Sequence, residues 1–179
     1  MKILFISDIH GIIDNLEIID KKIKDLNIDK LICLGDIYYT GPSYNSNHKV
    51  NSIEVLNFLI KHKDKLICLR GNCDSDVDIK VSDFPICDSL SLINVDNINL
   101  YLTHGNKYNI DNNKIENGVL IYGHYHIPYI KNKDNVIYIC VGSISLPKEN
   151  NPTYALYENK KITIYDIYDN IIDSIDLNI

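Results

Sequence analysis

The strongest constraint on the fold is an alternation of short apolar runs with helical patterns through the first two thirds of the chain. A β-branched run at residues 2–7 and buried-type runs at residues 31–34 and 66–69 predict three strands. The intervening segments carry apolar residues at helical spacing: Leu16, Ile19, Ile23 and Leu26 in the first, and Ile53, Leu56, Leu59 and Ile60 in the second. This succession is typical of an α/β fold with parallel strands.

After about residue 88 the pattern changes to hairpins. Three pairs of strand-like runs flank turn-type segments: 90–95 with 98–103, 129–130 with 136–141, and 153–157 with 161–167. The segment between the second pair, residues 131–135, has the composition of a turn, and residues 119–122 and 171–177 add two further strands. We therefore predict two β-sheets with helices outside, in one domain over residues 1–179.

Charge and cysteine usage narrow the classes of function. The 24 acidic and 18 basic residues give a net charge of −6, which argues against a surface that binds a nucleic-acid backbone. Five cysteines without a C-x-x-C pair fit a reducing cytosol. Because Asp8 and His10 interrupt the apolar start, we expect a cytoplasmic protein that does not associate with a membrane.

Polar residues with glycine beside them follow five of the predicted strands. These segments are Asp8-Ile9-His10-Gly11, Gly35-Asp36, Gly71-Asn72-Cys73-Asp74, Thr103-His104-Gly105 and Gly123-His124-Tyr125-His126. The carboxyl ends of parallel strands lie at one edge of a sheet, so these side chains are expected to converge. Buried carboxylates and imidazoles are costly without partners, and divalent cations would satisfy them.

The ligand chemistry indicates which metals such a site would hold. Nitrogen and oxygen ligands without thiolate suit Mn²⁺, Fe²⁺, Ni²⁺, Co²⁺ or Zn²⁺ better than Ca²⁺. The candidate ligands are Asp8, His10, Asp36, Asn72, His104, His124 and His126. Seven ligands are too many for one tetrahedral ion, but they fit two ions that share a carboxylate. The spacing of two within Asp8/His10 and within His124/His126 would place each pair on one face of an extended strand, where it could bind one cluster.

The order of these motifs resembles the calcineurin-like metallophosphoesterase family, and within it the small YfcE-type bacterial phosphodiesterases. Further segments that fit this branch lie across the chain: Gly41-Pro42, Arg70 to Ser75, Phe84-Pro85-Ile86, Gly142 to Ser145, Leu146-Pro147-Lys148 and Asn151-Pro152. The resemblance implies a four-layer α-β-β-α sandwich with two mixed sheets. It also implies hydrolysis of a small phosphodiester at a dinuclear metal site.

The resemblance assigns the ligands residue by residue. One metal would be held by Asp8, His10, Asp36 and His126, and the other by Asp36, Asn72, His104 and His124, so that Asp36 bridges. A metal-bridging hydroxide would attack phosphorus in line with the leaving oxygen. Mn²⁺ is the ion we expect, with Ni²⁺, Co²⁺, Zn²⁺, Fe²⁺ and Mg²⁺ as alternatives.

The residues around Asn72 depart from the wider family in one position. At the position of Cys73, the wider superfamily usually has a histidine. In the superfamily that histidine protonates the leaving group or contacts phosphate. We count Cys73 with Asp36, Asn72 and Asp74 as catalytic candidates, Asp74 as a helper group or a turn cap. Because a thiol is a weak acid at neutral pH, we expect substrates whose leaving group needs little protonation. A nucleophilic Cys73 is the less favoured reading.

Substrate contacts are assigned with less support from the sequence. Arg70, the only arginine, could bind phosphate with Cys73 or form a structural ion pair. The loop region after Asp36 offers an aromatic wall for a leaving group, made of Tyr38, Tyr39, Tyr44 and His48. The alternative class is a non-catalytic scaffold that resembles the retromer scaffold subunit. An edge strand near the C-terminus could also form a homo-oligomer.

Overall fold

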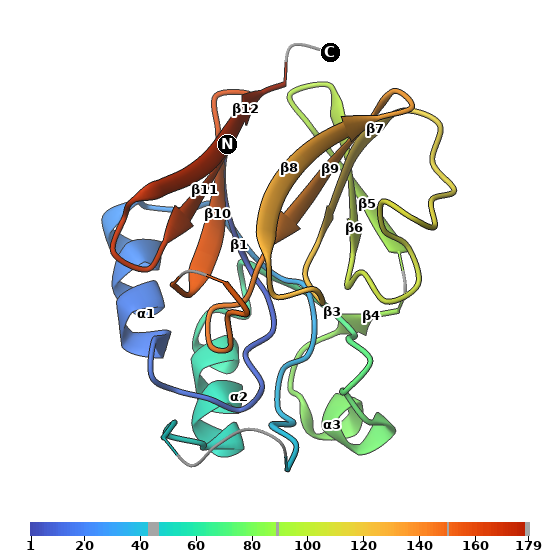
Figure 1. Ribbon diagram of the computed structural model, residues 1–179. Coiled ribbons are helices and arrows are strands. Elements are labelled where there is room, and N and C mark those ends of the chain that lie inside the picture. The colour runs from blue at the N-terminus through green and yellow to red at the C-terminus, as the bar shows by residue number, and fades with distance from the viewer. Residues whose placement is uncertain (43–46, 89, 150, 178–179) are drawn as a thin grey trace.

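Two β-sheets pack face to face in the computed structural model, which describes residues 1–42, 47–88, 90–149 and 151–177 (Figure 1). The larger sheet has the strand order β12-β11-β10-β1-β2-β3-β4. Its strands are β1 (Lys2–Ile6), β2 (Lys30–Cys33), β3 (Leu66–Leu69), β4 (Ile86–Cys87), β10 (Thr153–Glu158), β11 (Lys161–Asp166) and β12 (Ile171–Asp176). Strands β1 to β3 run parallel, as the sequence pattern predicts, and β4 joins them in parallel. Strands β10 to β12 extend the sheet in antiparallel fashion.

The smaller sheet has the order β5-β6-β7-β9-β8. Its strands are β5 (Leu90–Val95), β6 (Ile98–Thr103), β7 (Gly118–Tyr122), β8 (Pro128–Lys133) and β9 (Val136–Val141). The three central strands are parallel and both edge strands are antiparallel, so this sheet is also mixed. The predicted fold class, α/β with two mixed sheets, is confirmed.

Two-residue turns close the three hairpins. Asp96 and Asn97 have φ angles of 53° and 66°, and the pairs Asp134/Asn135 and Asn159/Lys160 also have positive φ. Such turns match the twist of the flanking strands, and Asn and Asp tolerate this conformation. The turn predicted over residues 131–135 is confirmed only at Asp134 and Asn135, because β8 continues to Lys133. Its last residues are polar because they are exposed, not because the chain turns there.

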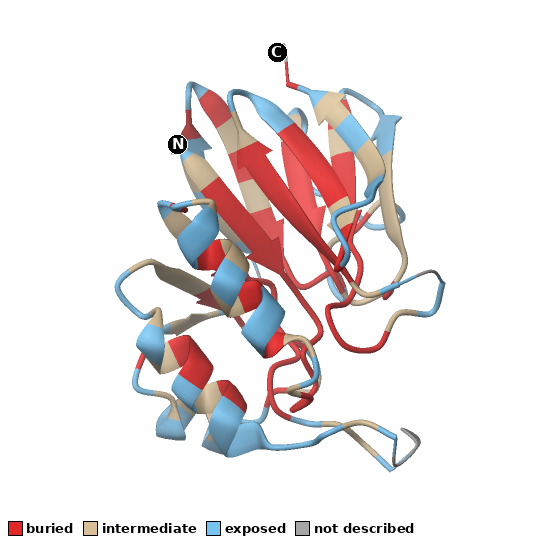
Figure 2. Ribbon diagram, turned by 90° about the vertical axis from the view of Figure 1, so that its left-hand side faces the viewer, coloured by how far each residue is buried: buried red, intermediate tan, exposed pale blue. Residues whose placement is uncertain are grey.

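The described residues form three helices, α1 (Leu16–Asp25), α2 (Ser52–Lys61) and α3 (Asp76–Val81), and the first two lie along the larger sheet. Leu16, Ile19 and Ile23 of α1 are buried, as its apolar spacing predicts. In Figure 2, α1 and α2 show exposed outer sides, and their buried patches face the sheet. The predicted stripe of α2 was partly wrong, because Ile53 is 71% exposed while Phe58 lies in the core.

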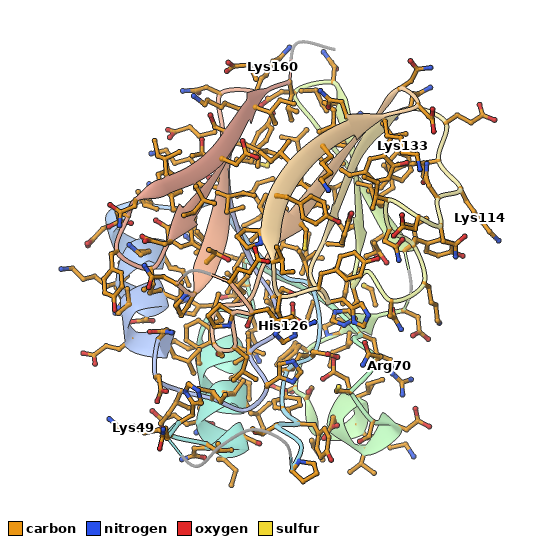
Figure 3. The ribbon with its side chains drawn as sticks, in the orientation of Figure 1. Lys49, Arg70, Lys114, His126, Lys133 and Lys160 are labelled. Carbon is orange, nitrogen blue, oxygen red and sulfur yellow. The ribbon has the colours of Figure 1, made fainter. Side chains whose placement is uncertain are left out.

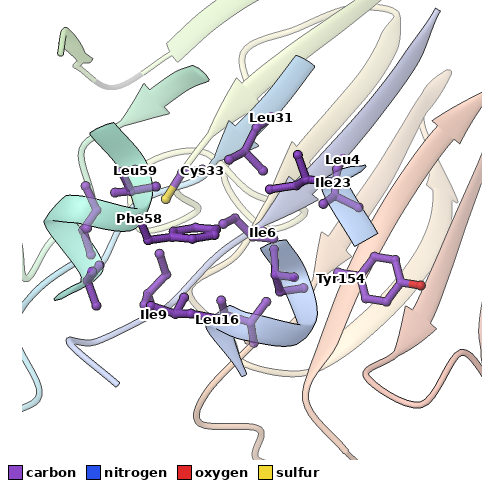
Figure 4. Close-up of a cluster of buried hydrophobic side chains, with 14 of the residues drawn as sticks. Leu4, Ile6, Ile9, Leu16, Ile23, Leu31, Cys33, Phe58, Leu59 and Tyr154 are labelled. Carbon is purple, nitrogen blue, oxygen red and sulfur yellow. The ribbon is translucent and has the colours of Figure 1, made fainter. Parts of the chain in front are cut away.

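The apolar core has two main layers and a smaller one. Helices α1 and α2 cover one face of the larger sheet, and Phe58, Cys33 and Tyr154 lie in this layer (Figure 4). The second layer lies between the sheets, where Ile3 and Phe5 of β1 face residues such as Ile121 of β7.

The outer face of the smaller sheet differs from the four-layer expectation. All of residues 104–117 are described, and they form no helix. Ile110 and Ile115 of this irregular segment pack against Tyr122 and Tyr138, so the segment replaces a helical layer. Its many Asn, Asp and Gly residues have low helix propensity, which is a physical reason for the difference.

The free edges of the two sheets meet at β8 and β12. The N–H of Ile130 in β8 donates to Asp173 Oδ2 of β12 at 3.1 Å. Part of the C-terminal edge strand is therefore covered within the chain.

Among the described residues, no helix combines the length and apolar character needed to cross a membrane.

Candidate metal centre

The polar strand ends of both sheets meet at one place in the fold. The larger sheet contributes Asp8, Asp36 and Asn72 from the ends of β1, β2 and β3, and the smaller sheet contributes the histidines after β6 and β7. In Figure 3, His126 lies below the end of β8, above α2 and between the two sheets. The convergence that the sequence predicts is present, although these residues span more than a hundred positions.

Two groups of ligand atoms form around this point. In the first, Asp8, His10 and His126 offer atoms that all lie within 4.8 Å of one another, and in the second Asp36, His104 and His124 do the same. Asp36 faces both groups, because its Oδ2 lies 3.7 Å from His10 Nε2 and 3.3 Å from His104 Nε2.

Asn72 completes this arrangement from the exposed side. Its Oδ1 lies 3.1 Å from His104 Nε2. Every one of the seven candidate ligands is thus beside another, and the amide of Asn72 lies where solvent and substrate can reach.

The backbone turns sharply at most of the ligands. Five of them have positive φ, between 53° and 64°: Asp8, His10, Asp36, His124 and His126. This conformation is uncommon for residues other than glycine, and it clusters at functional sites.

These turns correct the prediction made from spacing. Neither pair lies on an extended strand. Asp8 and His10 still belong to one group, as predicted, but His124 and His126 belong to different groups. The two-residue spacing therefore does not place both imidazoles on one face.

Backbone carbonyls orient three of the imidazole rings. The Nδ1 atoms of His10, His104 and His126 lie 2.8, 2.8 and 2.6 Å from the carbonyl oxygens of Tyr39, Leu34 and Leu146. Each Nδ1 therefore carries the proton, and in a neutral ring the Nε2 lone pair points into the site.

This arrangement leaves acceptors facing one another. His10 Nε2 and His126 Nε2 are 3.3 Å apart, and the buried Asp8 Oδ1, which has no hydrogen-bond partner, lies 3.3 Å from His126 Nε2. Lone pairs and a bare carboxylate oxygen at such distances are repulsive unless a proton or cation lies among them. The donor set fits divalent metal ions, with nitrogen and oxygen ligands of the expected kind.

The pKa shifts of Asp8 and His104 also indicate that the site favours a positive charge. Burial opposes ionisation of Asp8, but His126 and His104 outweigh it and lower its pKa. Burial likewise opposes the charge of His104, while Asp36 and Asp8 raise its pKa to about 9. The two carboxylates thus hold a proton on an imidazole, and a cation would take over that role.

Asp74 holds the two loops together. Its carboxylate accepts from the N–H groups of Asp36, Ile37 and Gly71 at 2.9, 2.7 and 2.8 Å. Burial, with the nearby charge of Asp36, raises its pKa despite these bonds. Asp74 therefore positions the loops, and its capping role is the one the contacts favour.

Glycine is required where these loops meet. A Cβ on Gly71 would overlap the Asp36 carboxylate, and a Cβ on Gly123 would overlap Ser7 and Asp8. The close approach of the backbone is therefore part of how the carboxylates are positioned.

Cys73 and Arg70 occupy different positions at the site. The backbone N–H of Cys73 donates to Asp36 Oδ1 at 2.8 Å, and its Sγ belongs to a third group with His10 and Asp36. Burial and the Asp36 charge raise the pKa of its thiol to about 12, so it is no thiolate at neutral pH. Arg70 forms an ion pair with Asp76 at 2.8 Å and borders a cavity with Asn72.

The predicted aromatic wall is divided in the structure. Tyr38 and Tyr39 border one cavity, whereas His48 borders another and lies 2.8 Å from Asp14. Tyr44 lies outside the described residues. The carbonyls of Leu34, Tyr39 and Leu146 were not predicted, since nothing in a side-chain pattern indicates which carbonyl will orient a ring.

The sheets and this cluster of ligands define the class of protein. Residues 1–161 match the model of the calcineurin-like phosphoesterase superfamily domain. The chain therefore belongs to the calcineurin-like phosphoesterase superfamily, which confirms the resemblance seen in its motifs.

Individual relatives match along nearly the whole chain. The chain is 31% identical to phosphodiesterase YfcE of Escherichia coli strain K12 over 175 residues, 96% of this chain and 95% of the relative. The solved structure of YfcE, a phosphoesterase from E. coli, matches with a TM-score of 0.94 at 30% identity, covering 99% of this chain and 100% of the other. Vps29 complexed with Zn²⁺ from Entamoeba histolytica shares the fold alone, with a TM-score of 0.66 at 18% identity and coverage of 99% and 100%.

Proposed function

We propose that this chain is a metal-dependent phosphodiesterase that hydrolyses a small phosphodiester at a centre of two divalent cations, with Mn²⁺ as the expected ion. The observation that carries the proposal is the position of Asp36, whose Oδ2 lies within 4 Å of an imidazole from each ligand group. The similarity to phosphodiesterase YfcE over 96% of the chain supports the reaction class.

The proposed division of ligands follows the two groups. Asp8, His10 and His126 would hold one cation, and Asn72, His104 and His124 the other, with Asp36 shared. When bound, two such cations lower the pKa of water and neutralise charge on phosphate oxygens. In the reaction, water adds to phosphorus, one ester P–O bond breaks, and the alcohol leaves with a proton.

The protein's own residues prepare this site in three ways. Backbone carbonyls fix the imidazole rings, so little rearrangement is needed when charge develops. The Cys73 N–H holds one oxygen of Asp36, which leaves the other facing both ligand groups. Asn72, on the exposed side, leaves room for the phosphate to approach.

The absence of histidine at position 73 limits the leaving group. A thiol is a poor proton donor beside a carboxylate, so esters of acidic alcohols are expected to react fastest. Arg70, paired with Asp76, is proposed to assist phosphate binding only as a charge at the rim.

The alternative, a scaffold of the same fold without catalysis, has less support. A scaffold does not need four imidazoles and two carboxylates aimed at one point, since their burial without a cation is costly. The same experiment separates the two functions.

That experiment measures hydrolysis of bis-p-nitrophenyl phosphate by metal-stripped protein, with Mn²⁺, Ni²⁺, Co²⁺, Zn²⁺ and Mg²⁺ restored in turn. We expect metal-dependent turnover that Asp36→Asn and His124→Ala each reduce by a factor of about a thousand. Circular dichroism of both variants controls for folding. Folded wild-type protein that shows no turnover with any metal would refute the proposed activity.

A further inference from the structure

A cavity of about 400 Å³ lies beside the metal centre, between α2, α3 and the segment after β2. Residues that line it include Tyr38, Tyr39, Ile53, Leu56, Cys73 and Val81. A volume of this size falls within the range of small-molecule sites, which run from about 300 to 1,000 Å³.

The walls of this cavity are apolar because its polar side chains are already engaged. Ser52 Oγ donates to the Tyr38 carbonyl at 2.9 Å. Ser75 and Asp78 bond each other's backbone N–H in a capping box at the start of α3.

Three of the apolar side chains, by contrast, are not used by the core. Tyr39, Ile53 and Val81 are 54%, 71% and 58% exposed. Two helices and a loop thus present large hydrophobic side chains around one cavity. A single exposed apolar side chain would need no explanation, whereas a group of them marks an interaction site.

The cavity adjoins the metal centre at two residues. Cys73 lines the cavity, and its Sγ also lies within 4.8 Å of ligand atoms of His10 and Asp36. Tyr39 lines it too, while its carbonyl orients His10. A group esterified to a phosphate at the centre would therefore reach these walls.

Charge indicates which ester group fits. None of the described residues lining this cavity is Lys or Arg, and Asp78 adds a carboxylate. A separate cavity of about 360 Å³, which borders the same Asn72 segment, contains Arg70 and Lys107 instead. A further phosphate or carboxylate on the substrate is thus disfavoured in the first cavity.

We propose that the 400 Å³ cavity binds an uncharged aromatic ester group of the phosphodiester substrate, namely the group that stays on phosphorus when the other ester bond breaks. The inference rests on the proposed phosphodiesterase function and specifies its substrate class. Aromatic rings fit because Tyr39 offers a ring, and Ile53, Leu56 and Val81 offer aliphatic walls of matching character.

The kinetic test compares two substrates with the same leaving group. Bis-p-nitrophenyl phosphate carries a second aromatic ester, and methyl p-nitrophenyl phosphate carries a small one. We expect Val81→Asn and Ile53→Asn to reduce kcat/KM for the diaryl ester about fivefold to tenfold, mainly through KM, and to leave the methyl ester within twofold.

Val77 supplies the matched control. It lies on the same helix as Val81 and is 66% exposed, but it does not line the cavity. Val77→Asn should change neither substrate by more than about twofold. Equal losses on both substrates, or a loss with Val77→Asn of the same size, would overturn the proposal.

A binding measurement separates this proposal from the catalytic one. Methyl NMR spectra of the Zn²⁺-loaded protein are recorded with diphenyl phosphate and with dimethyl phosphate. The Ile53 and Val81 methyl signals should shift with diphenyl phosphate but not with dimethyl phosphate. The Val77 methyl signals should shift with neither compound. Turnover without such shifts would refute aromatic binding in the cavity and leave the proposed phosphodiesterase activity intact. Shifts without turnover would refute the activity and leave aromatic binding in the cavity intact.

Discussion

Positive φ at five of the candidate ligands turns their side chains out of the strand direction and toward one another. Each such residue carries backbone strain of order 1–3 kcal/mol, which the surrounding contacts must hold. Asp74 provides part of that restraint, since its carboxylate binds three backbone N–H groups from the two loops. At the scale of single residues, the site depends as much on such contacts as on the ligands themselves.

The Gly71→Ala variant tests this dependence on the supporting backbone. A methyl group at Gly71 meets the Asp36 carboxylate and must displace it. Metal affinity, measured by competition with a chelator, should fall at least about tenfold, as is usual when the support of a ligand is altered.

Gly118→Ala is the control for general destabilisation. Gly118 begins β7 with φ of +111°, so the substitution strains the backbone away from the ligands. Its metal affinity should stay within about twofold while its stability falls. Unchanged affinity in Gly71→Ala would contradict the role given to this contact.

At the scale of elements, α1 and α2 are linked by Asp20. Its Oδ1 accepts from Lys61 and faces His62 Nε2, at 2.7 and 2.8 Å. Burial lowers the pKa of His62 even though Asp20 opposes that shift. The imidazole is therefore more readily protonated in the unfolded chain than in the folded one.

This difference sets the sign of a pH effect. Below the unfolded pKa of about 6.5, the unfolded chain binds more protons at this position, so stability falls as pH decreases toward the folded pKa. Between pH 7.5 and 5.5, wild-type protein should lose up to about 1 kcal/mol more unfolding free energy than His62→Gln. Urea unfolding at both pH values measures this, and parallel losses in the two proteins would refute it.

Elements differ in how well the sequence predicts them. The strand at residues 66–69 and the hairpin of β5 and β6 were predicted to the residue, because buried runs and turn pairs mark their limits. Helix α3 was missed, since none of its six residues is buried and no apolar stripe marks it. Strand β4 has two residues, too few for any periodicity.

At the scale of the molecule, the candidate centre lies where the ends of two sheets meet. The sequence predicts these residues as candidate ligands because each follows a strand. The spacing of His124 and His126 predicted one shared group for both, which was wrong, because the groups they join depend on how the sheets face each other. The apolar cavity also could not be predicted from the sequence, because Ile53 and Val81 lie on different helices.

Metal binding should stabilise the whole fold, because the ligands come from both sheets. A cation at about a thousand times its Kd contributes ~4 kcal/mol, which raises Tm by about 10 °C for a chain of this size. Calorimetry with Mn²⁺ and with a chelator measures the shift. Asp36→Asn should reduce it to a few degrees, and equal shifts in both proteins would place binding elsewhere.

Anomalous X-ray scattering from Mn²⁺-loaded crystals would show whether two cations share Asp36. We expect two peaks about 3.5–4 Å apart, one beside Asp8, His10 and His126, the other beside Asn72, His104 and His124, with Asp36 touching both. A single peak, or two peaks without Asp36 between them, would contradict this expectation.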